Sequence, residues 1–514
     1  MVKALFQVHP LTLPEIIAKI ASFLPLWKYS ESLGFYDFNP SFLLSCTRVS
    51  KTWKAALLPV IWLVFDGFTM RQIPKEILVR NSSHFRLFFG DCLLGVSFQC
   101  RHLRELSISR WDKDLLQLIR ENAPSLECFS WKATQAPSST MPNLDYDLIT
   151  QMAPTLQNLS LSHWVISGRQ FVQFLAQCRR LTSLNLTAVH WIDPIPQRQT
   201  YSCDNEFASL YHFHRGLGIR QLSLDISEAK NGAFVDLIQR CPDLESFSLY
   251  SVRAQDPKLF IPVLRQSCPK LTNIEYTVRY CSRLGLRDYL SEDGYADFVL
   301  ASPRLTSVKM DVPWLGDALT SALLFQAAAL ESLSLQFYEH REDQPWANAE
   351  NLLRILKNSR RLKRLSLLFS RQALGEEETL RLLEPSWGCE ELESLTLTGL
   401  TMMCDRPSPI PCSPQFQWRF PGMEPVQGSD RSGGQDSIGS VQAPAQASPK
   451  HKLIELVQRM PKLEALNLNL VTFSLEGLRS HSWSACSLKV ETKSKIELQI
   501  PSLKATSDTR QQDL

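Results

Sequence analysis

The stretch LRELSI at residues 103–108 decides the fold, because the same phrase returns along most of the chain. An apolar residue, two variable residues, a second apolar residue, one polar residue and a third apolar residue recur as LQNLSL at 156–161 and LESLSL at 330–335. Twelve copies occur, and the last clear one is LEALNL at 463–468. Recurrence on this scale predicts a repeat protein, whose extended surface serves binding more often than catalysis.

The segments around each copy complete one structural unit. Within a copy, apolar residues alternate with a polar one, which predicts a short strand with one buried face. Between copies, apolar residues follow helical spacing, as in 115–119, and these segments end at corners such as Cys241-Pro242, where proline cannot continue a helix. Ten intervals cover the 289 residues from Leu103 to Leu392, so the mean period is near 29.

This unit resembles the leucine-rich repeat of the Cys-Pro-x-Leu type. The fold class that follows is α/β: a leucine-rich-repeat solenoid with parallel strands on its concave side and helices on its convex side, preceded by a small all-α head. One unit cannot bury its own apolar face, so stacked neighbours complete the core.

The polar residue inside each copy is expected to face the concave side. These residues are mostly serine and are Ser107, Ser130, Ser160, Asn185, Ser223, Ser248, Glu275, Lys309, Ser334, Ser366, Thr396 and Asn467. Such a column is either a ligand-reading face or a set of small hydroxyls that fit a crowded sheet and hydrogen-bond across strands. Glu275 and Lys309 interrupt the column, and with Tyr276 they form its most individual stretch.

Two enlarged intervals mark candidate recognition elements. The interval from 181 to 219 is 38 residues long and carries an aromatic, histidine-rich insert, and the interval from 271 to 305 is 34 residues long. Insertions in solenoids often project and recognise partners, although structural padding explains them equally well. The expected target-binding residues, with exposure inferred from repeat register, are Trp191, Tyr211, Glu275, Tyr276 and Lys309.

Residues 8–66, called the head below, predict a small helical domain. A Thr-x-x-Glu capping box at 12–15 opens a run of apolar residues at helical spacing that ends at Pro25. Two further apolar helical stretches lie between residues 41 and 62. Three short helices are marginal alone, so burial against a partner or against the solenoid would stabilise them.

The head resembles the F-box, and the whole chain resembles a fungal-type F-box protein with C-terminal leucine-rich repeats. Leu13-Pro14 matches the opening Leu-Pro of the family, 49–53 (VSKTW) matches its Val-Cys-Arg-x-Trp stretch, and Ile61-Trp62 matches the closing Leu-Trp. Ser and Lys replace the usual Cys and Arg in the middle stretch, and the loop at 26–39 is longer than in compact members. The alternative interpretation is a helical cap for the solenoid.

The resemblance implies a function for each part. The head would bind the Skp adaptor, and through it a cullin, of an SCF-type ubiquitin ligase. The repeats would bind an unknown target protein for ubiquitination and proteasomal degradation. The residues implied in adaptor binding, with the first two at the interface and the tryptophan more in the core, are Leu13, Pro14, Ile17, Ile20 and Trp53. The alternatives are a leucine-rich-repeat interaction scaffold or an inhibitor without a role in ubiquitin transfer.

Catalytic, cofactor and nucleic-acid chemistry is not indicated. The motifs GxxxxGK[ST], GxGxxG, HExxH and GxSxG do not occur, so we expect no enzyme, no cofactor and no metal. His212-Phe-His214 has no supporting ligand at short spacing. A net charge of +3 over 514 residues gives no electrostatic case for nucleic acid or membrane, and the basic run at 360–364 is interpreted as a solvated edge.

The cysteine pattern and the N-terminal residues bear on the compartment. Thirteen cysteines are scattered without a CxxC pair, which favours small buried hydrophobes over a disulfide framework. The first ten residues carry no apolar core of signal-peptide length, and the longest apolar run is too short to span a bilayer. We therefore expect a cytoplasmic or nuclear protein.

The break between Leu392 and Leu463 is interpreted as an insert within one repeat. Residues 405–450 are rich in Pro, Gly, Ser and Gln, which predicts disorder, and removing these 46 residues restores an interval of 25. The expected organisation is the head at 8–66, a linker or entry to the solenoid at 67–100, leucine-rich repeats at 101–404, a disordered insert at 405–450, the last repeat and C-terminal cap at 451–503, and a disordered tail at 504–514.

Overall fold

The computed structural model describes most of the first four hundred residues. Described are residues 13–401 apart from 25, 31–34, 91–97, 110–112, 134–142, 194–215, 226–231, 252–259, 279–289, 338–348, 370–375 and 384–386, and beyond them 456, 459–460, 462–463, 465–472 and 484–490. The chain divides into two compact units, residues 1–310 and 311–514, called unit 1 and unit 2. The expected insert at 405–450 and the tail at 504–514 lie outside the described residues.

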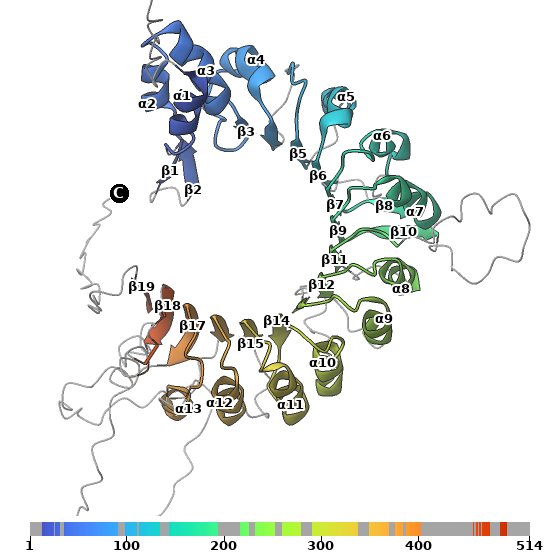
Figure 1. The fold of residues 1–514 in the computed structure, drawn as a ribbon, viewed down its shortest axis with the longest axis vertical. Coiled ribbons are helices and arrows are strands. Elements are labelled where there is room, and N and C mark those ends of the chain that lie inside the picture. Colours follow the sequence, from blue (N-terminus) through green and yellow to red (C-terminus); the bar gives the residue numbers. More distant parts are fainter. Residues whose placement is uncertain are drawn as a thin grey trace, which may run out of the picture. The chain divides into compact units, whose positions relative to one another are not determined.

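Unit 1 contains a parallel sheet built from the predicted repeats (Figure 1). Its strands, in their order across the sheet, are β3 (Val64–Asp66), β4 (Leu87–Phe89), β5 (Glu105–Ile108), β6 (Cys128–Lys132), β7 (Asn158–Ser162), β9 (Ser183–Thr187), β11 (Gln221–Asp225), β12 (Ser246–Ser251), β13 (Asn273–Val278) and β14 (Ser307–Val312). Sequence order and spatial order agree, as stacked repeats require.

The register of this sheet aligns the repeat copies residue for residue. Ser107 pairs with Ser130, and Glu275 pairs with both Ser248 and Lys309. The apolar positions on either side, such as Leu249, are buried, whereas the polar column is half-buried or exposed. Successive side chains of a strand point to opposite faces, so the apolar columns form the core and the polar column forms the other face.

Helices cover the apolar side of the unit 1 sheet, and the strands line the inner side in Figure 1. The helices that follow the strands are α4 (Lys75–Asn81), α5 (Lys113–Asn122), α6 (Tyr146–Thr150), α7 (Gly168–Gln177), α8 (Gly232–Gln239), α9 (Phe260–Ser267) and α10 (Glu292–Val299). The strand side away from these helices is called the inner face below. The fold class expected from the sequence, a leucine-rich-repeat solenoid of α/β type, is confirmed.

Two neighbouring repeats carry a second, smaller sheet. β8 (Val165–Ser167) pairs in parallel with β10 (His190–Asp193) just past the ends of β7 and β9. His163 and Ala188 occupy the same repeat position, and both adopt left-handed backbone angles, with φ of 61° and 49°. This conformation is unfavourable for residues other than glycine, and it turns the chain from the first sheet into the second.

In its described residues, the head contains three helices and two paired strands. They are α1 (Pro14–Ala21), β1 (Trp27–Ser30), β2 (Phe35–Phe38), α2 (Ser41–Cys46) and α3 (Lys51–Ile61). α1 packs against α3, with Ile17 and Ala21 buried between them. Leu13 is the N-cap of α1 and caps it without a side-chain hydrogen bond, so the capping box predicted from Thr12 is wrong. Ser50 caps α3 through its Oγ, which accepts a 3.1 Å hydrogen bond from the Trp53 N–H.

The sheet of unit 1 begins inside the segment expected to be head and linker. β3 and β4, at 64–66 and 87–89, pair in parallel ahead of β5. The linker expected at 67–100 therefore contains a strand and α4, a difference that arises because these strands lack the leucine spacing of later copies. Their core is aromatic instead: the rings of Phe65 and Phe88 stack at 4.4 Å, and Phe85 lies 5.4 Å from Phe65 and 6.5 Å from Trp62 of the head.

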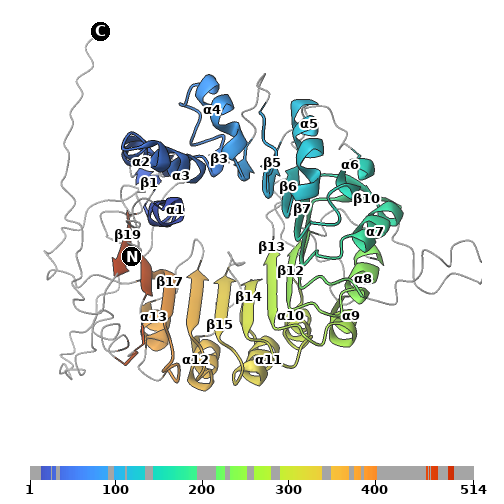
Figure 2. The same ribbon diagram turned by 45° about the horizontal axis from the view of Figure 1, so that its top comes forward.

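Unit 2 continues the repeat pattern with a shorter sheet, seen face on in Figure 2. Its elements are α11 (Asp317–Gln326), β15 (Ser332–Phe337), α12 (Ala349–Asn358), β16 (Arg364–Phe369), α13 (Glu376–Leu382), β17 (Ser394–Thr401), β18 (Ala465–Thr472) and β19 (Ser484–Val490). The strands pair in parallel up to β18, which pairs with β19 antiparallel. Gly399 has a φ of +77° at a bulge, where a Cβ would collide with the Phe369 carbonyl oxygen.

Candidate functional site

An exposed apolar stripe runs along α1 of the head. Leu13 is the N-cap, Ile16 and Ile20 lie within the helix, and Phe23 lies two residues past its end. Their spacing of three, four and three residues keeps them toward one side of α1. Their exposed fractions are 37%, 36%, 46% and 73%. These four residues, called the α1 stripe below, leave an apolar face without cover in a part of the molecule where Ile17 and Ala21 already supply the internal core.

The structure separates the residues implied in adaptor binding. Leu13, Pro14 and Ile20 are exposed, as docking requires, and Trp53 is half-buried. Ile17 is 2% exposed, so its assignment as an adaptor-contacting residue is wrong. Ile17 packs toward α3 together with Ala21, on a face of α1 that adjoins the face carrying Ile16 and Ile20.

Sequence reasoning missed several exposed apolar residues of the head. Ile16 and Phe23 belong to the α1 stripe, and Phe42 and Val49, on and just after α2, are 64% and 66% exposed. The signal that identifies Ile16 and Phe23 is their spacing from Leu13, since this spacing puts them with Ile20 in one stripe beside the buried stripe of Ile17 and Ala21. Nothing in the sequence of α2 ranks Phe42 above its buried neighbour Leu43.

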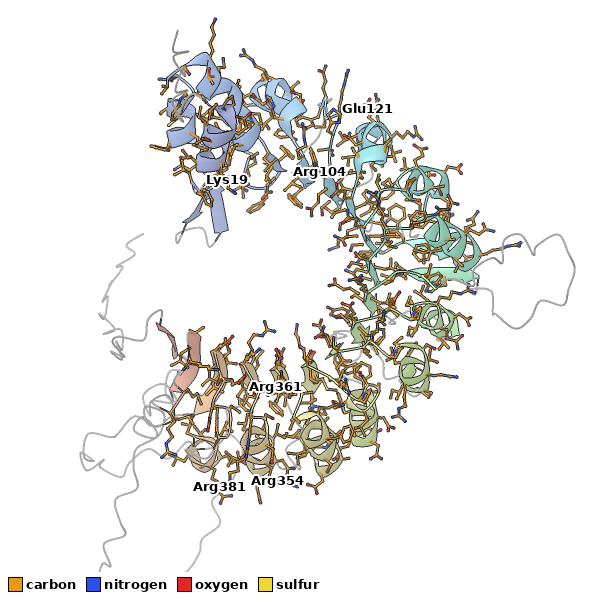
Figure 3. The ribbon with its side chains drawn as sticks, in the orientation of Figure 1. Lys19, Arg104, Glu121, Arg354, Arg361 and Arg381 are labelled. Atoms are coloured by element: carbon orange, nitrogen blue, oxygen red, sulfur yellow. The ribbon has the colours of Figure 1, made fainter. Side chains whose placement is uncertain are left out.

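A pocket of about 420 Å³ lies beside the C-terminal end of the α1 stripe. It is lined by Ala21, Ser22, Phe23, Leu24, Leu26, Val60, Ile61, Leu63 and Val64. Lys19, labelled in Figure 3, places its ammonium 4.9 Å from the centre of the Phe23 ring. The pocket offers apolar walls to a side chain that reaches past the end of α1.

The inner face of unit 1 carries a polar network at β12–β14. The Ser248 hydroxyl donates a 2.9 Å hydrogen bond to Glu275 Oε2, and Lys309 Nζ lies 2.6 Å from Glu275 Oε1. Burial and the neighbouring Glu275 carboxylate raise the pKa of the Tyr250 hydroxyl. The Glu275 side chain is 21% exposed and that of Lys309 is 58% exposed, so these two residues, which the sequence suggests for target binding, form one accessible ion pair.

Two of the expected target-binding residues belong to the core. Tyr276 is fully buried, because it pairs with Leu249 and Met310 in an apolar column, and its ring contacts Tyr295 at 5.6 Å. Trp191 is 9% exposed and packs edge-on against Phe171 and Phe234. Their expected exposure is therefore wrong, whereas Tyr211 and the histidines of the same insert lie outside the described residues.

Cysteines of the repeats pack as apolar side chains. Burial raises the pKa of the thiols of Cys100, Cys178, Cys268 and Cys389 to about 12. These thiols stay protonated and shielded, and a protonated thiol is a poor nucleophile. In the described part of the chain, no group of three or more His, Cys, Asp or Glu is placed to hold a metal ion.

The basic run of unit 2 forms ion pairs with Glu331, just ahead of the N-terminal ends of β15 and β16. Arg361 Nη2 and Lys363 Nζ lie 3.6 and 3.1 Å from the Glu331 carboxylate oxygens, and Arg361 is labelled in Figure 3. These pairs neutralise part of the run at 360–364. Over the residues that the structure describes, none of the helices has the length and apolar character needed to cross a bilayer.

Comparison with known proteins yields structural matches alone. No family model and no curated protein matches the chain. It is similar to the crystal structure of the Rad7 and Elc1 complex in yeast, with 13% identity over 70% of this chain and 81% of that one and a TM-score of 0.36. The leucine-rich-repeat protein LegL7 from Legionella pneumophila has 9% identity over 60% and 82% of the two chains and a TM-score of 0.30. A leucine-rich-repeat protein from Leptospira interrogans has 13% identity over 62% and 91% and a TM-score of 0.21.

Proposed function

We propose that the protein is the substrate-recognition subunit of an SCF-type ubiquitin ligase. The head binds a Skp-type adaptor and, through it, a cullin. The inner face of the repeats binds a target protein for ubiquitination and proteasomal degradation. The chain itself makes and breaks no bond; it raises the effective concentration of the target near the ubiquitin-charged enzyme. The proposed compartment is the cytoplasm or the nucleus.

The observation that carries this proposal is the α1 stripe, in the part of the chain that resembles the F-box. Fully burying one large apolar side chain contributes roughly 1.5–3 kcal/mol, so covering four half-exposed ones yields several kcal/mol before association costs are subtracted. Contiguous exposed apolar side chains of this kind mark interaction sites. The adaptor-binding residues proposed on this basis are Leu13, Pro14, Ile16, Ile20 and Phe23.

The second candidate is a leucine-rich-repeat scaffold or inhibitor that takes no part in ubiquitin transfer. The aromatic cluster at β3 and β4 favours it, because Trp62 packs on Phe85 as a cap would pack on the end of a solenoid. A cap has no need for the α1 stripe, whose four side chains each stay at least 36% exposed. The two candidates differ in whether a cullin assembles with the chain.

Adaptor binding tests the proposal directly. A full-length variant with Ile20→Asp and Phe23→Asp should bind a purified Skp-type adaptor at least about 100-fold more weakly, because two charges replace apolar contact area. Leu13→Ala with Pro14→Ala should weaken binding less. The matched control is Phe325→Asp, which alters a residue 66% exposed on α11 of unit 2. Calorimetry measures the affinities.

Two results would contradict the proposal. Unchanged adaptor affinity in the Ile20→Asp, Phe23→Asp variant would show that the α1 stripe is not the docking face. Adaptor binding that fails to bring a cullin into the complex, measured by co-purification of the three components, would favour the scaffold.

A further inference from the structure

Four adjacent strands of unit 1 present an almost uncharged inner face. The side chains of β7, β9, β11 and β12 on this face, called the neutral tract below, are Asn158, Ser160, Ser162, Ser183, Asn185, Thr187, Gln221, Ser223, Asp225, Ser246, Ser248 and Tyr250. Asp225 carries the one acidic group among them, and it is 1% exposed. The tract therefore offers a partner hydroxyls and amides.

Charged side chains flank the neutral tract on both sides. Lys132 on β6 is exposed next to β7, and the Glu275–Lys309 pair lies on β13 and β14 next to β12. Because Glu275 accepts from Ser248 as well as from Lys309, its charge is already compensated. The neutral tract is thus an uncharged surface with charged side chains on the strands at each side of it.

The chemistry of the tract selects its partner. A charged side chain pressed onto it loses water and gains no opposite charge, which is costly, whereas an amide or a hydroxyl finds both donors and acceptors. The tract is also preorganised: Asn185 Nδ2 donates to Ser160 Oγ at 3.2 Å, and the Thr187 hydroxyl donates to Asn185 Oδ1 at 3.0 Å. Groups fixed in this way lose little freedom when a partner binds.

The spacing of the strands selects the partner's shape. Neighbouring strands lie about 4.8 Å apart, and the pitch of an α-helix is about 5.4 Å, so a helix laid across the strands places one turn on each. In an extended chain, side chains on one face repeat about every 6.8 Å, so they no longer align with strands about 4.8 Å apart after the first strand. A helix also satisfies its own backbone, so it needs the tract for side-chain contacts alone.

We propose that the target protein presents an α-helix of about four turns across β7, β9, β11 and β12, with Asn, Gln, Ser and Thr on the face that contacts the neutral tract. This inference rests on the proposed role of the inner face in target binding. It adds the secondary structure and the side-chain chemistry of the segment that the repeats recognise.

The test is a selection from a display library of helices. Each library member is a rigid mini-protein with a helix of four turns, and one face of that helix varies among amide, hydroxyl, acidic, basic and apolar residues. Members that bind the full-length chain are selected. The affinity of each selected clone is then measured for two variants of the full-length chain. Each variant carries one lysine in place of a serine of the polar column. Ser223→Lys puts a cation in the centre of the neutral tract, and Ser366→Lys, paired with Ser334 in unit 2, is the matched control.

The expected clones carry amides and hydroxyls on the variable face, bind Ser223→Lys at least about tenfold more weakly than the parent and bind Ser366→Lys unchanged. Clones that depend on Ser223 but carry charged or apolar faces overturn the inference and leave the inner face as the binding site. A selection in which no clone depends on Ser223 overturns the inference together with the inner-face role. Adaptor binding by the head is measured separately and is not affected by either result.

Discussion

Two exposed surfaces of unit 1, the α1 stripe and the neutral tract, differ in what they offer a partner. The α1 stripe exposes Leu13, Ile16, Ile20 and Phe23, whose burial gives binding energy without fixed direction. The neutral tract exposes hydroxyls and amides, which discriminate between partners because each buried polar group left unpaired is costly. The difference fits the proposed function, in which the head binds one adaptor and the repeats select a target.

The largest expected effect is a difference in stability between substitutions at the buried and the exposed isoleucines of α1. Ile17→Asp should lower the free energy of unfolding by about 4–5 kcal/mol, because it buries a carboxylate against α3 without a partner. Ile20→Asp, three residues further on, should change it by less than about 1 kcal/mol, since Ile20 is 46% exposed. Urea unfolding followed by tryptophan fluorescence measures both. Equal destabilisation would mean that the α1 stripe is packed and not available.

The next effect tests the alternation of β13, the strand at the border of the neutral tract. Tyr276→Ala should destabilise the protein by about 3 kcal/mol or more, because it leaves a cavity beside Tyr295. Glu275→Ala, the adjacent residue, should cost less than about 1 kcal/mol, because its partner Lys309 is largely exposed. Thermal unfolding gives both values. A larger loss for Glu275 would place that residue in the core and remove the border.

The smallest effect is the contribution of the buried repeat thiols to the pH dependence of stability. The buried thiols keep their protons up to about pH 12 in the folded state, whereas an unfolded thiol loses its proton near pH 9. Stability is therefore lost as the pH rises above 9, by about 1.4 kcal/mol per thiol at pH 10. Cys178→Ala should reduce this loss of stability by about 1.4 kcal/mol, the contribution of one thiol. The difference between urea midpoints at pH 8 and pH 10 measures it. An unchanged pH dependence in that variant would show that Cys178 is accessible to hydroxide when folded.

The repeat architecture followed from the sequence because its signal is redundant. Twelve copies of one spacing defined the strands, and the register of the polar column came out as predicted from Ser107 to Lys309 in unit 1 and from Ser334 to Asn467 in unit 2. Each copy reports the same physical constraint, which is the burial of alternate side chains, so a local irregularity in one copy does not change the assignment.

The site was less predictable, because it depends on single residues. Tyr276 stands beside the polar column in sequence, yet strand alternation turns it into the core with Leu249. Trp191 lies in a second sheet that begins after the left-handed residue Ala188, and no repeat spacing announces that turn. β3 and β4 were missed because their core is phenylalanine rather than leucine. For Trp191, β3 and β4 a tertiary contact decides exposure, whereas the burial of Tyr276 follows from its place as the third apolar residue of the copy at 271–276.

The aromatic junction between head and repeats makes the two inseparable in practice. Deleting residues 1–66 removes β3, which pairs with β4, and Phe65, whose ring stacks on Phe88. The shortened chain would expose a strand edge and several phenylalanine rings, the combination that promotes aggregation. Loss of adaptor binding in such a truncation would report misfolding. Exchange of heads between related proteins would likewise succeed only with a seam placed beyond Phe98, where the ring cluster ends.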